Sequence, residues 1–174
     1  MLAFQAGDRR AFDELFARYT PRLHSFLTRM VRDRGRAEEL TQDVFIRLYT
    51  AAERYEARTR FSTYVFGIAH NLALNHLARA WRQREQSLGE GAPEPASDAA
   101  GPAEQLDAAR THAALERALG GLPERQRAAL LLRTQEDMGY EEIAAALGTS
   151  VPSVKSLLHR AREALLARLG KADP

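Results

Sequence analysis

Residues 140–160 read YEEIAAALGTSVPSVKSLLHR, and this stretch decides the fold of the second half of the chain. Ile143 and Leu147 lie about one helical turn apart, which predicts a short helix with an apolar face. Gly148 suits the left-handed conformation that ends a helix tightly, and Ser150 suits the cap of the helix that follows. Two helices joined by a tight glycine turn predict a helix-turn-helix, which places its second helix in the DNA major groove.

The second helix of this motif has an apolar face and a polar face. Its apolar residues recur at helical spacing: Val151, Val154, Leu157 and Leu158. The candidate DNA-binding residues on the other face are Lys155, Ser156, His159 and Arg160. Side chains of these types reach base edges or phosphates from a helix in the major groove. The alternative is a helical hairpin that only packs and leaves its basic residues in solvent.

The first part of the chain, residues 1–85, predicts a separate helical domain. A first apolar stripe has helical spacing and comprises Phe12, Leu15, Phe16, Tyr19, Leu23, Phe26, Leu27 and Met30. Pro21 interrupts this stripe, so it either kinks one helix or opens a second one. Two further apolar stripes follow at 40–48 and 61–77, and the polar segment 53–60 between them predicts a loop.

A change of composition separates this domain from the helix-turn-helix. Residues 86–105 are rich in Gly and Pro among Ala, Ser and Glu, which is typical of a flexible linker. Residues 106–174 then form the second domain. We therefore predict an all-α protein with two small helical domains and an acidic linker between them.

The composition excludes several classes of protein. Hydrophobic residues make up 45% of the 174 residues and charged residues 28%, which is enough for packed cores. The chain has no cysteine, its five histidines lack metal-ligand spacing, and it has no Gly-rich phosphate loop. We therefore expect no enzymatic activity, no metal and no cofactor. We also expect a cytoplasmic protein without membrane insertion, because no signal peptide and no apolar run of about 20 residues is present.

The charges are unevenly distributed although the net charge is only +2. Basic residues gather near position 80 and again near the C-terminus, and the segment between them is acidic. Two basic poles suggest two contacts with one polyanion. An ordinary solvated surface explains the charges equally well.

Four segments together resemble one protein family. They are GDRRAFDELF at 7–16, AEELTQDVFIRL at 37–48, FSTYVFGIAHNLA at 61–73, and LPERQR at 122–127 followed by the helix-turn-helix. In this order and spacing the chain resembles the bacterial RNA polymerase sigma factors of the extracytoplasmic-function (ECF) type, which keep only regions 2 and 4. The resemblance covers nearly the whole chain outside the linker. It implies that core RNA polymerase and promoter DNA are partners, and that an anti-sigma factor controls the protein.

The resemblance also implies roles for individual residues. The expected polymerase-binding residues are Glu38, Glu39, Leu40, Gln42, Asp43 and Ile46. The expected residues for the −10 element and DNA melting are Asn71, Asn75, Arg54, Arg58, Arg60 and Arg79. The recognition helix would read the −35 element as duplex DNA. Simpler alternatives remain: a solvated face for the carboxylates, and helix capping or a core hydrogen bond for Asn71. For Tyr64 and Phe66 we favour core packing over a role in melting.

The chain also departs from the family pattern. The family usually has Trp at the position of Tyr64, Arg at Gly67 and often at His70, and Asp at Asn75, so the basic face of this helix is thinner here. Arg is also common in the family where Leu157 stands in the recognition helix. A rival interpretation is a helix-turn-helix regulator that binds promoter DNA independently of polymerase. A pull-down with core polymerase separates the two, because only a sigma factor must bind it.

Overall fold

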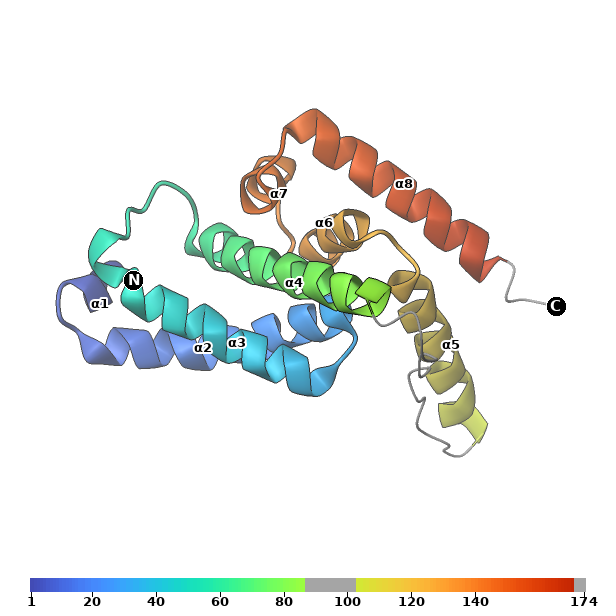
Figure 1. Ribbon diagram of the computed structural model, residues 1–174, viewed down its shortest axis with the longest axis horizontal. Helices are drawn as coiled ribbons and strands as arrows, with labels where there is room; N and C mark the ends of the chain where they lie inside the picture. Colours follow the sequence, from blue (N-terminus) through green and yellow to red (C-terminus); the bar gives the residue numbers. More distant parts are fainter. Residues whose placement is uncertain (87–102, 171–174) are drawn as a thin grey trace.

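The computed structural model describes residues 1–86 and 103–170, with side chains described for 1–86 and 111–170. Within these ranges the chain is all-helical, as predicted. The elements are α1 (Leu2–Gln5), α2 (Arg9–Val31), α3 (Arg34–Thr50), a 3₁₀ turn (Ala52–Arg54), α4 (Phe61–Gln86), α5 (Ala103–Gly120), α6 (Glu124–Thr134), α7 (Tyr140–Leu147) and α8 (Val151–Leu169). Figure 1 shows α1 to α4 on one side of the molecule, and α5 to α8 on the other.

Pro21 lies inside a single continuous helix rather than opening a second one. A proline in a helix interior removes one backbone N–H from the hydrogen-bond ladder. Here Pro21 is exposed, and the neighbouring Thr20 hydroxyl donates to the Phe16 carbonyl oxygen at 2.6 Å. The apolar residues on both sides of Pro21 continue into the same core, so tertiary packing holds the helix together across the proline.

The helix ends follow local signals in the sequence. The Asp8 carboxylate accepts the Arg10 N–H at 3.0 Å at the start of α2, and Asp33 accepts the Arg36 N–H at 2.9 Å at the start of α3. Between these helices Arg32 adopts a left-handed conformation with a φ of 61°. A break of two residues therefore lets α3 fold back along α2 (Figure 1).

The helix-turn-helix forms as the sequence predicts. Gly148 is left-handed with a φ of 59° and closes α7. The Ser150 hydroxyl then accepts the Ser153 N–H at 3.3 Å and caps α8. The inward face of α8 is buried at Val154, Leu158 and Ala161.

The linker predicted at 86–105 is shorter at both ends. Helix α4 continues to Gln86, and α5 begins at Ala103. Ala and Leu after position 103 favour helix over the preceding Pro and Gly. The remainder of the predicted linker, residues 87–102, lies outside the described residues.

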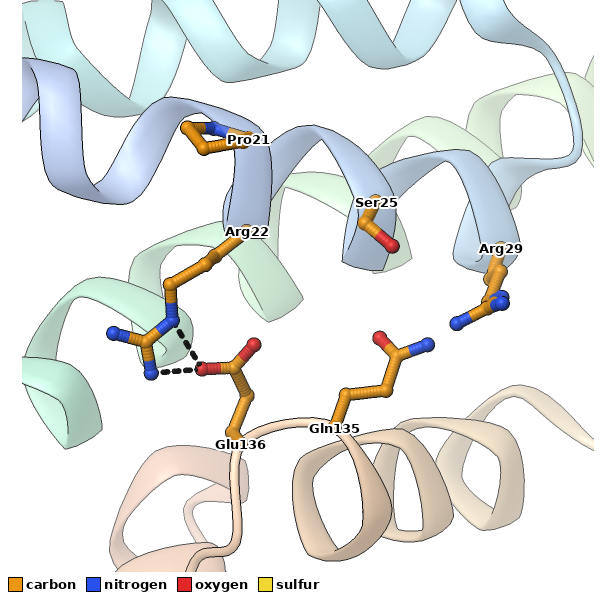
Figure 2. Close-up of a pocket in the computed structure, with 6 residues that line it drawn as sticks. All are labelled: Pro21, Arg22, Ser25, Arg29, Gln135 and Glu136. Atoms are coloured by element: carbon orange, nitrogen blue, oxygen red, sulfur yellow. Dashed lines mark hydrogen bonds and ion pairs between the residues drawn. The ribbon is translucent and has the colours of Figure 1, made fainter.

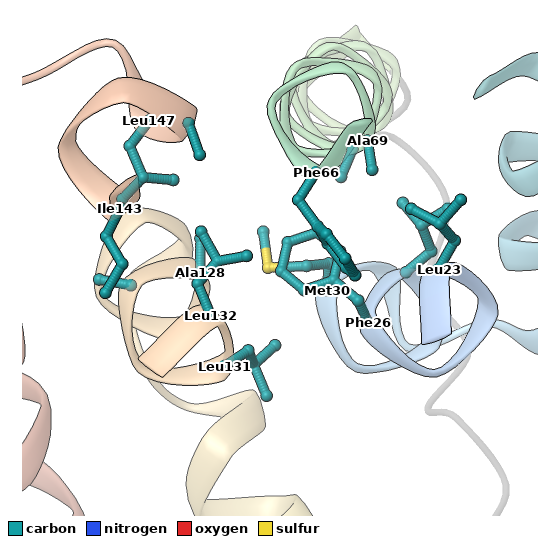
Figure 3. Close-up of a cluster of buried hydrophobic side chains, with 14 of the residues drawn as sticks. Leu23, Phe26, Met30, Phe66, Ala69, Ala128, Leu131, Leu132, Ile143 and Leu147 are labelled. Atoms are coloured by element: carbon teal, nitrogen blue, oxygen red, sulfur yellow. The ribbon is translucent and has the colours of Figure 1, made fainter. Parts of the chain in front are cut away.

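One continuous apolar core joins the two groups of helices. Figure 3 shows Phe66 of α4 and Met30 of α2 facing Leu132 of α6, with Ile143 and Leu147 of α7 beside them. The Phe66 ring also packs edge-on against Phe26, with 5.4 Å between ring centroids. The halves predicted as separate domains therefore pack directly on each other.

Candidate nucleic-acid interface

The polar face of α8 is open to solvent. Lys155, Ser156, His159 and Arg160 are all exposed, as a helix for the major groove requires. The Lys155 ammonium lies 5.9 Å from the centre of the Tyr140 ring, which steadies it by a cation–π contact. His159 lies 3.4 Å from the Glu163 carboxylate one turn along the helix. The four residues form one surface, and the cap at Ser150 fixes its start.

A second polar surface lies along α4. Asn71 and Asn75 are exposed one helical turn apart, and Arg79 continues the same side of the helix. Asn71 lies in the middle of α4 and makes no hydrogen bond to the described residues, so neither capping nor a core hydrogen bond explains it. The prediction of core packing is confirmed for Phe66, which is fully buried, while Tyr64 is half-buried against Tyr55.

The loop before α4 carries the three other arginines of the predicted melting site. Arg54 is exposed without an acidic partner among the described residues. Arg58 forms an ion pair with Glu56, while Arg60 lies 3.3 Å from Glu142 of α7. Two of the three guanidinium groups therefore already face carboxylates, and one of those carboxylates belongs to the other half of the molecule.

Helix α3 presents a mixed polar and apolar face. Glu38, Glu39, Gln42, Asp43 and Ile46 are all exposed, whereas Leu40 is buried in the core. Leu40 therefore packs in the core beneath this face and is not part of the exposed surface that a partner would contact. Helical spacing was the available signal, because Leu40, Val44 and Leu48 recur every four residues along one side of the helix.

Sequence reasoning missed three exposed hydrophobic side chains. Tyr49 has 59% of its surface exposed, equal to Ile46, and follows it on the same face of α3. The exposed Phe16 ring lies 4.5 Å from Phe45, at the edge of the same region. Trp81 is 65% exposed at the C-terminal end of α4, and its place between Arg79 and Arg82 was the available signal.

Two charged or titratable groups are unexpectedly buried. Arg127, from the LPERQR segment, is 6% exposed, and burial lowers the pKa of its guanidinium group. His70 is 1% exposed, and burial together with the nearby Arg125 charge lowers its pKa to about 4. His70 is therefore neutral at pH 7 and adds no positive charge to α4.

The residues at 1–86 and 103–170 show neither a membrane-spanning helix nor a metal site. Within them, no helix is long and apolar enough to cross a membrane. The same residues contain no group of three or more metal-ligating side chains.

Comparison with known proteins assigns both halves of the chain. A family model described as Sigma-70 region 2 matches residues 15–83, and one described as Sigma-70, region 4 matches residues 112–165. The RNA polymerase sigma-H factor of Pseudomonas aeruginosa is 33% identical over 168 residues, covering 92% of this chain and 87% of the relative. The ECF RNA polymerase sigma-E factor of Escherichia coli K12 is 30% identical with the same coverage.

A solved structure shares the fold over nearly the full length. The sigma factor RpoE of Bartonella quintana, in complex with the anti-sigma factor NepR, has a TM-score of 0.75 and 24% sequence identity to this chain. The alignment covers 95% of this chain and 99% of RpoE. From the two matched regions and the full-length relatives, the chain belongs to the ECF family of RNA polymerase sigma factors, which are non-enzymatic transcription initiation factors.

Proposed function

We propose that residues 1–85 bind core polymerase and open the promoter at the −10 element, while residues 106–174 read the −35 element. The observation that carries this proposal is the pair of exposed polar faces on α4 and α8. Each lies on a helix whose opposite face is built into the core, so each is held rigidly for contact with DNA. The cytoplasm, where bacterial DNA and polymerase reside, is the proposed compartment.

The −35 element is read by α8 in this proposal. Lys155 and Arg160 supply positive charge, and Ser156 and His159 supply hydrogen-bonding groups. The Ser150 cap fixes the start of α8, and Lys155 and Ser156 in its first two turns are exposed, which suits insertion into the major groove.

The −10 element is bound as separated strands along α4. The exposed amides of Asn71 and Asn75 suit the edges of unpaired bases, and Arg79 and Arg54 suit phosphates. Arg58 and Arg60 also bind DNA phosphates in this proposal, once the phosphates replace their carboxylate partners Glu56 and Glu142.

Core polymerase binds the exposed face of α3 in this proposal. Glu38, Glu39, Gln42 and Asp43 surround Ile46, and we add Tyr49 to this face because it is equally exposed. An apolar centre with a polar rim is the usual composition of a protein interface.

We also infer that an anti-sigma factor controls the chain. The similarly folded RpoE was solved with such a partner. This inference rests on shared family and fold, and exposed apolar groups such as Ile46 and Phe16 offer surface for such a partner.

The first test concerns the recognition helix. Lys155→Ala should weaken binding to −35 duplex DNA about tenfold, because it removes one charged contact in the groove. The measurement is the dissociation constant for a −35 duplex by fluorescence anisotropy at fixed salt. Arg117→Ala is the matched control, since it removes one exposed charge from α5 instead. Equal affinity for Lys155→Ala and wild type would refute the role of this residue.

The second test concerns polymerase. Asp43→Ala should weaken the affinity for core enzyme about fivefold, on the order of 1 kcal/mol, because Asp43 lies on the proposed docking face. Competition against a labelled sigma factor measures this affinity. Glu85→Ala removes an exposed carboxylate from the far end of α4 and should change nothing. A chain that binds promoter DNA but never core enzyme would instead support the independent regulator.

A further inference from the structure

The short helix α1 lies ahead of the residues that the Sigma-70 region 2 model matches, which begin at position 15. Figure 1 shows α1 near the end of α3, where the chain enters the loop before α4. The Phe4 ring packs 4.8 Å from the Phe12 ring of α2 and 5.4 Å from the Tyr49 ring of α3, measured between centroids. A helix of four residues has no stability of its own in water, so these ring contacts hold α1 in place.

The Gln5 side chain joins α1 to the 3₁₀ turn that opens this loop. Its amide nitrogen donates to the Glu53 carbonyl oxygen at 3.0 Å and to the Tyr55 carbonyl oxygen at 3.2 Å. The side-chain amide has two hydrogens, so both bonds form at once. The two carbonyl groups belong to the residues on either side of Arg54. Gln5 therefore fixes the backbone before and after Arg54 from a distant part of the sequence.

The turn itself sets Arg54 at the edge of the loop. The Arg54 N–H donates to the Ala51 carbonyl oxygen at 3.1 Å. Tyr55 is buried and packs on Tyr64 with 5.2 Å between ring centroids, whereas residues 56–60 are all exposed. Arg54 thus projects into solvent from a backbone that the core holds on one side and Gln5 holds on the other.

Arg54 also differs from the arginines of α2, whose charges are already paired. Arg22 forms an ion pair with Glu136 at the edge of a surface pocket (Figure 2), and Arg29 donates to Glu116 at 2.9 Å. Among the described residues, no carboxylate pairs with the Arg54 guanidinium. The backbone, and not an ion pair, therefore decides where this side chain points.

We propose that Gln5 is a positioning residue for promoter DNA, which directs Arg54 toward a phosphate of the −10 strand by holding the Glu53 and Tyr55 carbonyl groups. The proposal rests on the proposed function of Arg54 and adds α1 to the −10 site. Gln5 is uncharged and does not touch the DNA. Its hydrogen bonds order the turn before DNA arrives, so binding does not have to bear the cost of ordering it.

The variant Gln5→Met tests this proposal, because methionine has a similar length but donates no hydrogen bond. The full-length chain is bound to core polymerase, and the probe is a fluorescent single strand that carries the −10 element of a promoter transcribed by this holoenzyme. Gln5→Met should weaken the affinity for this strand about fivefold. The affinities for core polymerase and for −35 duplex should not change, which also shows that the variant is folded. Gln126→Met makes the same chemical change on α6 and should bind the strand as the wild type does.

Salt dependence gives a readout that a merely structural role would not move. Each phosphate contact to a single strand contributes about 0.7 to the slope of log affinity against log salt concentration. Gln5→Met should lower this slope as Arg54→Ala does, although Gln5 carries no charge. The double variant Gln5→Met/Arg54→Ala should bind no more weakly than Arg54→Ala alone, because no guanidinium is left to position.

The outcomes separate this inference from the proposed function. If Arg54→Ala weakens binding and Gln5→Met does not, the inference is overturned and the role of Arg54 stands. Losses that multiply in the double variant would also overturn it, because Gln5 would then act by another route. If Arg54→Ala changes neither the affinity nor the slope, the proposed −10 contact of Arg54 fails, and the inference fails with it.

Discussion

Arg127→Met should lower the free energy of unfolding by about 3–5 kcal/mol. The guanidinium is buried, and it is the donor for the carbonyl oxygens of Met30, Leu119, Gly120 and Leu122. Methionine fills similar space but donates nothing, so these buried acceptors lose a partner. Urea denaturation at pH 7 measures the loss.

Arg117→Met provides the comparison for Arg127→Met. Arg117 is exposed and donates only to Ala113 within its own helix, so its replacement should change stability by less than about 0.5 kcal/mol. A loss below about 1 kcal/mol for Arg127→Met would show that the buried charge costs as much in desolvation as its hydrogen bonds return.

Acidification from pH 7 to pH 5 should remove about 2 kcal/mol of stability through His70 alone. Its folded pKa of about 4 lies below the ordinary value of 6.5, so the unfolded chain takes up the proton first. The contribution of neutral His70 to the free energy of unfolding is therefore complete above about pH 6.5 and is lost as the pH falls toward 4. Neither ring nitrogen of His70 has a hydrogen-bond partner among the described residues that could hold the proton.

Denaturation at the two pH values measures this effect. His70→Leu should flatten the difference, because leucine does not titrate. His112→Leu should keep it, since the His112 side chain is 66% exposed. An unchanged pH dependence in His70→Leu would mean that other groups cause the acid sensitivity.

Local features of the fold were predictable from the sequence because their causes are local. The turn at Gly148 and the cap at Ser150 depend on the residues that form them. Pro21 left two possibilities open, since the choice depends on packing from elsewhere in the chain. The burial of Arg127 and His70 was beyond sequence reasoning. Arg is mostly exposed in proteins, His is intermediate, and only long-range contacts bury these two.

The candidate site was predictable to a similar extent. The exposed face of α8 follows from helical periodicity, and the structure exposes every residue named there. Leu40 and Tyr49 on α3 show the limit. The apolar stripe at 40–48 placed Leu40 on the core side, but the family resemblance named Leu40 as a polymerase-binding residue and left out the exposed Tyr49. The sequence suggested a thinner basic face at Gly67 and His70, and the structure puts Gly67 against α7 and buries His70.

The apolar seam in Figure 3 has a consequence for the protein's colloidal behaviour. If the two groups of helices separated, Phe66, Met30 and Leu132 would be exposed to solvent together. A contiguous exposed apolar surface of this kind promotes aggregation. The packing of the two groups of helices on each other therefore also protects the protein against aggregation.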